Sequence, residues 1–227
     1  MHLKRHTKNE LMKKLLLIAL VTSFVFGECN KNENPAPPPA SNFQPTKAGS
    51  VWNFRNTNLL TAATSNFSLT ALAKDSTLSG RVYRVFANSS GPNEYFANLA
   101  GEYFQFGRFE GIASPVDLLY LKPELPVGGT WQEVKTITVS NVPVTVTFNY
   151  RLAEKGISFV VGANTFTKVT RVSLELNAVG LPITSQSINF YYADGIGRIF
   201  SKVKLVVPLA GINNDSETAL TSYTLAP

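Results

Sequence analysis

The chain has 227 residues, of which 44% are hydrophobic and 16% are charged, a composition typical of a folded globular protein rather than a disordered one. Half of the formal net charge of +6 lies in the first 28 residues. Residues 29–227 carry 16 basic and 13 acidic side chains, a net +3, which is too small for a nucleic-acid-binding surface. His2 and His6 are the only histidines and Cys29 is the only cysteine, so the following domain has no Ser-His-Asp, Cys-His or His-rich zinc site. We expect no metal and no cofactor.

Residues 1–28 are predicted to be a signal peptide. Lys13 and Lys14 precede an apolar run from residue 15 to 26, which has the length of a signal-peptide core and is shorter than the ~20 residues that a membrane-spanning helix needs. Met12 stands directly before the two lysines, so we expect translation to begin there.

Cys29 directly follows this segment and precedes a polar stretch, an arrangement that resembles a bacterial lipoprotein signal. The resemblance implies that Cys29 becomes the mature N-terminus and is attached to the membrane through lipid. Glu28 stands where that family usually has a small residue, and cleavage after Gly27 with soluble secretion is the alternative. Residues 29–48 contain five prolines and almost no large apolar side chain, which predicts a flexible tether.

The remaining residues, 49–227, show apolar and polar side chains in alternation, the pattern of half-buried strands. The clearest example is residues 142–152, and turn signals such as Gly128-Gly129 and Asp194-Gly195 separate the runs. The spacing predicts one all-β antiparallel domain of about 10–12 strands, either a strongly curved sheet or half-barrel, or a sandwich. A parallel α/β sheet is excluded because its strands would be apolar on both faces.

Three segments resemble elements of uncharacterised lipoproteins that are common in Bacteroidota. They are the Leu-Pro…Gly…Trp element at residues 125–131, the Tyr-Tyr-Ala-x-Gly-x-Gly hairpin within residues 190–199, and the closing strand at residues 220–223. The resemblance implies export to the cell envelope, with a lipid anchor in the outer membrane. It implies no activity.

Four aromatic residues are candidates for an apolar binding surface, because at this spacing they fall on both faces of a strand. One face is expected to serve the core, and the other is either covered by a second layer or exposed as a groove for an apolar ligand. These residues are Tyr103, Phe104, Phe106 and Phe109.

A second candidate is the hairpin at Asp194-Gly195, where Tyr191 has the opposite parity to Phe190 and Tyr192. Tyr191 and Arg198 are expected either to bind an acidic or sugar ligand together or to form a simple cross-strand pair.

These observations favour a non-enzymatic, membrane-anchored binding module for an envelope component, a protein partner or an apolar ligand. One alternative is a carboxylate-dependent enzyme acting on glycans, which would bring two acids into one cleft. Another is a structural spacer without a partner. The acids available to such an enzyme are Glu94, Glu102, Glu110, Asp117, Glu124, Glu133 and Asp194.

Overall fold

The computed structural model describes residues 41–108, 115–139 and 142–227. The predicted signal peptide, Cys29 and the tether up to residue 40 lie outside the described residues. Residues Ser41–Pro227 form one compact unit. In the described ranges, no helix has the length and apolar character needed to cross a membrane.

The unit is built from strands joined mostly by short turns, with one short 3-10 helix among the described residues. The elements are β1 Val51–Asn58, β2 Thr64–Leu78, β3 Arg81–Asn88, β4 Glu94–Leu99, β5 Glu102–Arg108, β6 Pro115–Leu121, β7 Thr130–Val139, β8 Val142–Val161, β9 Asn164–Ala178, β10 Ser185–Ala193, β11 Gly197–Val207, η2 Pro208–Ala210 and β12 Ile212–Thr224.

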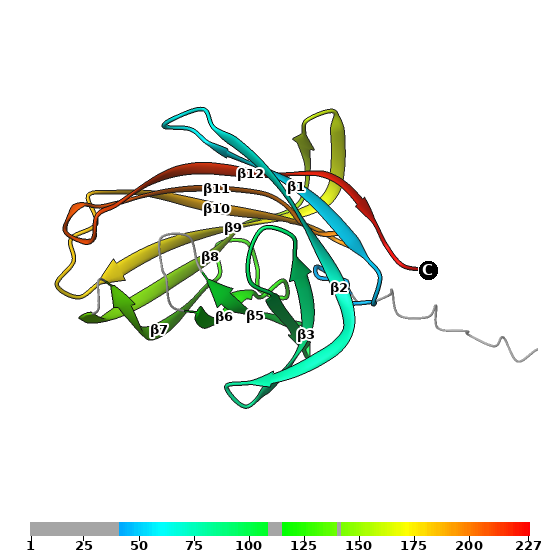
Figure 1. Cartoon of the computed structure of the whole chain (residues 1–227), viewed down its shortest axis with the longest axis horizontal. Helices are drawn as coiled ribbons and strands as arrows, with labels where there is room; N and C mark the ends of the chain where they lie inside the picture. The colour runs from blue at the N-terminus through cyan, green and yellow to red at the C-terminus, as the bar shows by residue number, and fades with distance from the viewer. Residues whose placement is uncertain (1–40, 109–114, 140–141) are drawn as a thin grey trace, which may run out of the picture. The chain divides into compact units, whose positions relative to one another are not determined.

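All twelve strands belong to one antiparallel sheet of order β6-β5-β4-β3-β2-β1-β12-β11-β10-β9-β8-β7. The prediction of a single all-β antiparallel domain is confirmed. Strands that follow one another in the chain pair, except β6 and β7, and the first strand, β1, also pairs with the last, β12; β6 and β7 are therefore the two edges of the sheet. The sheet curves until its edge strands β6 and β7 approach one another, so that it is nearly closed into a barrel (Figure 1).

Trp131 links these two edges. Its indole Nε1 in β7 donates a hydrogen bond of 2.8 Å to the carbonyl oxygen of Leu119 in β6. The Trp131 ring also stacks on Tyr150 of β8, with centroids 5.1 Å apart and planes at 6°. The Trp131 side chain therefore joins β7 to β6, the two edge strands whose backbones would have to pair to close the sheet.

Alternation along the strands divides the inner face from the outer face. In β11 every second residue from Gly197 to Val207 is buried, and the residues between them are partly exposed. The main core is formed by the buried side chains of the inner face, including Phe148 and Ile199, which are fully buried.

A second, smaller core joins strands β3 to β6 and consists of Tyr83, Ala97, Phe104 and Leu119. The Arg81 guanidinium covers it, with its carbon atom 3.6 Å from the centre of the Phe104 ring. Asp117 in turn accepts hydrogen bonds from Arg81 at 2.8 Å and from the Tyr83 hydroxyl at 2.6 Å.

The segment Ser41–Pro45, which we call the strap, packs onto the compact unit although the sequence places it in the tether. Phe43 is 4% exposed and its ring meets that of Tyr103 edge-to-face, with centroids 6.1 Å apart. The Tyr103 hydroxyl accepts from the Phe43 backbone N–H at 3.0 Å and donates to the Ser41 carbonyl at 2.9 Å.

Candidate functional site

The four aromatic candidates of residues 103–109 lie on both faces of β5, as expected. Tyr103 is fully buried on the strap side, and Phe104 is buried in the second core. Phe106 is partly buried and packs edge-to-face on Tyr95, with centroids 6.0 Å apart. Phe109 lies outside the described residues. Among the described candidates, only Phe106 keeps part of its ring on the surface.

The structure separates Tyr191 from Arg198. Tyr191 faces outward and stacks on Phe159, with ring centroids 4.0 Å apart. Arg198 pairs with Tyr192 on the inner face, because the register of β10 against β11 shifts between Tyr191 and Tyr192. This bulge reverses the parity of Arg198 and turns its side chain inward, to within 5.5 Å of the Phe54 ring.

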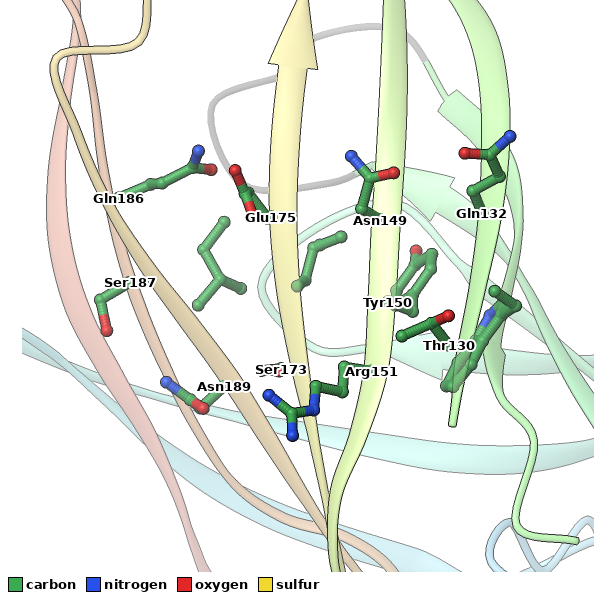
Figure 2. A pocket seen from close by; sticks show the side chains of 13 residues that line it. Thr130, Gln132, Asn149, Tyr150, Arg151, Ser173, Glu175, Gln186, Ser187 and Asn189 are labelled. Atoms are coloured by element: carbon green, nitrogen blue, oxygen red, sulfur yellow. The ribbon is translucent and has the colours of Figure 1, made fainter. Parts of the chain in front are cut away.

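A groove of about 860 Å³ lies across β7, β8, β9 and β10 on the outer face (Figure 2). The sequence pattern alone does not reveal it. The pairing registers place its polar side chains in two rows that cross the strands. One row is Gln132, Asn149 and Glu175, and the other is Thr130, Arg151, Ser173 and Asn189.

The groove lies where β9 and β10 stop pairing. Their ladder ends at Leu174 opposite Ile188. Beyond this point the Gln186 side chain replaces the backbone hydrogen bonds between the two strands. Its Oε1 accepts from the Leu176 N–H at 2.8 Å and its Nε2 donates to the Leu176 carbonyl at 3.0 Å. The side chain thus bridges two strands that the backbone no longer joins.

The groove lining is mostly polar. The two rows contribute amides, hydroxyls and a single pair of opposite charges, while the side chains of Tyr150, Leu174 and Ile188 turn into the core and are each at most 4% exposed. A volume of about 860 Å³ falls in the ~300–1,000 Å³ range of sites that hold small molecules.

Most polar side chains of the groove have no internal partner. Within the described part of the chain, the side chains of Gln132, Asn149, Arg151, Ser173 and Glu175 make no hydrogen bond or ion pair with another residue. Asn189 is held in place by Arg171, whose Nη1 donates to its Oδ1 at 3.0 Å. The groove therefore presents a set of donors and acceptors that are free to bond water or a ligand.

Among the acids considered for carboxylate catalysis, Glu110 lies outside the described residues, and Glu94 is the one whose surroundings raise its pKa. Burial raises the pKa of Glu94, and the nearby charge of Arg198 lowers it only in part. Its carboxylate accepts from the amides of Asn88 at 3.1 Å and Gln105 at 3.2 Å, so amides rather than a second acid surround it. No group of three or more His, Cys, Asp and Glu side chains suited to a metal occurs among the described residues.

Comparisons with known proteins find similarity only to solved structures. Neither a protein-family model nor a curated protein matches the chain. A candidate lipoprotein from Parabacteroides distasonis shares 13% identity over 82% of this chain and 99% of its own, with a TM-score of 0.49. A candidate exported protein with a YmcC-like fold from Bacteroides fragilis shares 9% identity over 82% of this chain and 100% of its own, with a TM-score of 0.47. The site described above therefore rests on the residues of this chain alone.

Proposed function

We propose that this protein is a non-enzymatic, lipid-anchored module of the bacterial cell envelope that binds a neutral, hydroxyl-rich polymer in the outer groove. An oligosaccharide is the chemical type of ligand that fits. One observation carries the proposal: a groove of about 860 Å³ is lined by amide and hydroxyl side chains, of which those of Gln132, Asn149 and Ser173 have no partner among the described residues.

The chemistry of the lining selects for such a ligand. A sugar hydroxyl both donates and accepts hydrogen bonds, as do the amides of Gln132 and Asn149 and the hydroxyl of Ser173. A purely apolar ligand would remove water from the polar rows without replacing its hydrogen bonds, at a cost of roughly 1–3 kcal/mol for each group.

The anchor follows from the sequence. A lipidated Cys29 and a Pro-rich segment would hold the compact unit close to a membrane while leaving it free to reach envelope material. Neither the histidines nor the cysteine of the chain lie within the compact unit, which supports binding rather than turnover.

The test is calorimetric titration of the chain, purified without its leader, with the neutral oligosaccharides maltohexaose, laminarihexaose and chitohexaose. Binding of at least one is expected. Asn149→Ala should weaken it about tenfold, because one amide that bonds the ligand is worth roughly 1.4 kcal/mol. Asn66→Ala makes the same chemical change at an exposed position of β2 and should leave the affinity unchanged.

Two results would contradict the proposal. If none of the three oligosaccharides binds, or if both substitutions affect the affinity equally, the groove is not the binding site. The same incubations, analysed for shortened oligosaccharides, test the non-enzymatic part, since their appearance would indicate a glycan-active enzyme.

A further inference from the structure

A second site lies on the inner face of the sheet, separate from the outer groove. It is a small pocket whose polar lining includes Arg198, the residue that the bulge turns inward. We call it the inner pocket. It is lined by Gln44, Trp52, Phe54, Leu69, Phe96, Gln105, Tyr120, Tyr192 and Arg198.

Four polar side chains of the inner pocket lack a partner. The Tyr120 hydroxyl is buried, in a residue that is 6% exposed, and makes no hydrogen bond. Within the described ranges, the side chains of Tyr192, Gln44 and Arg198 also make no hydrogen bond or ion pair. A buried polar group in a folded protein normally has a partner, so the unpaired Tyr120 hydroxyl points to a polar group that could occupy the pocket beside it.

The chemistry of these groups favours an oxyanion. The Arg198 guanidinium can donate two parallel hydrogen bonds to a carboxylate or a phosphate, and the Tyr120 and Tyr192 hydroxyls can add further donors. Glu94 is the acid whose charge interacts with Arg198, but it forms no ion pair with it and bonds instead to Asn88 and Gln105. The guanidinium is therefore free to bind an anion.

The strap covers the inner pocket. Gln44 is 8% exposed and belongs to the pocket lining, while its neighbour Phe43 is fixed against Tyr103. The hairpin that precedes Arg198 holds the strap on the other side, since Asp194 Oδ1 accepts from the Asn42 N–H at 2.7 Å and the Gly195 N–H donates to the Asn42 carbonyl at 2.8 Å.

Gly197 lies beneath the strap. Its φ of +108° is rarely adopted by other residues, and a Cβ there would be in ordinary contact with the strap, 3.6 Å from the Phe43 carbonyl and 3.7 Å from Gln44 Oε1. With the strap in place the cavity measures about 20 Å³, enough for a single water molecule and too small for a larger ligand.

We propose that the inner pocket is a binding site for one carboxylate or phosphate group, and that the strap must move aside before the group can enter. Arg198 binds the anion, and Tyr120 and Tyr192, the cross-strand partner of Arg198, donate to it. Because the strap continues directly into the predicted tether, its position links the anchored segment to the state of the site.

The test uses NMR detection of the Arg198 Nε–Hε signal in residues 30–227, which contain the whole compact unit. Acetate, inorganic phosphate and glucuronate are titrated separately to identify the type of oxyanion. In Phe43→Ala, which loosens the strap, at least one of them should shift the signal saturably. Its apparent affinity should be about tenfold higher than in the unchanged chain, because the competent state is more populated.

The pocket assignment is checked by adding Arg198→Gln to Phe43→Ala, which should abolish the binding. Faster hydrogen exchange of the Gly195 amide shows that the strap has been released. If that amide exchanges faster and none of the three anions shifts the signal, the proposal is overturned. Binding that survives Arg198→Gln overturns it as well. If Phe43→Ala does not fold, Asp194→Ala is used in its place in both experiments. This substitution removes the exposed hydrogen bond between the Asn42 N–H and Asp194 Oδ1.

Discussion

Replacing Trp131 by Phe tests how the sheet is held at its two edges. The substitution keeps an aromatic ring against Tyr150 and removes the indole N–H that bonds the Leu119 carbonyl. Leu119 is 8% exposed, so its carbonyl would be left without a partner in a largely dry environment. We expect a loss of about 1–2 kcal/mol in the free energy of unfolding. For a domain of this size the melting temperature should fall by roughly 2–8 °C.

Trp131→Ala removes the stacked ring as well. The expected loss is about 3–5 kcal/mol, the usual range for truncating a large packed aromatic side chain. Urea denaturation followed by circular dichroism measures both variants. Tyr223→Ala is the control, because Tyr223 is 41% exposed and its truncation should change the stability by less than about 0.5 kcal/mol.

The reasoning is refuted if Trp131→Phe unfolds within about 0.3 kcal/mol of the unchanged chain, since the hydrogen bond between the edges would then contribute nothing. It is also refuted if Trp131→Ala costs no more than the exposed control. In either case the edge strands would be held by contacts other than this side chain.

Three further predictions concern buried groups. Burial raises the pKa of Glu94, so the stability that its protonated form contributes is lost as the pH rises through that raised pKa. Between acid and neutral pH, the unchanged chain should therefore lose more stability than Glu94→Gln does, as measured by urea denaturation. Burial and the Asp117 hydrogen bond raise the pKa of Tyr83 to about 12, so stability should fall between about pH 10 and 12, and a chain with Tyr83→Phe that falls equally would contradict this. Phe43→Ala should lower the free energy of unfolding by about 3–5 kcal/mol, and a loss below about 1 kcal/mol would show that the strap is not a packed part of the unit.

Alternation was sufficient to predict the fold class, because inner and outer residues follow one another along most of each strand, as from Ile199 to Val207 in β11. It also predicted that the aromatics of β5 would lie on both faces. It could not show that Arg81 covers Phe104, because that contact joins segments far apart in the chain.

The groove was not predictable for the same reason. Gln132, Asn149 and Glu175 each read as an ordinary solvated residue on a strand, and only the register of β7, β8 and β9 brings them into one row. Arg198 was predicted to share a face with Tyr191, as regular pairing would require, and a single bulge places it with Tyr192 instead.

The strap was assigned to the tether because its composition is polar and Pro-rich. Its attachment depends on Phe43, together with backbone groups that bond Tyr103 and the 194–195 hairpin. Backbone hydrogen bonds do not depend on which side chains are present, so composition could not distinguish the packed strap from the rest of the predicted tether.

The most direct test of the proposed function is the map of backbone amide chemical shifts while the chain is titrated with the hexasaccharide that binds most tightly. The account predicts saturable changes along β7 to β10, centred on Asn149, Ser173 and Ser187, with none in β2 and β3. Changes centred elsewhere on the sheet, or no saturable change with any neutral oligosaccharide, would contradict it.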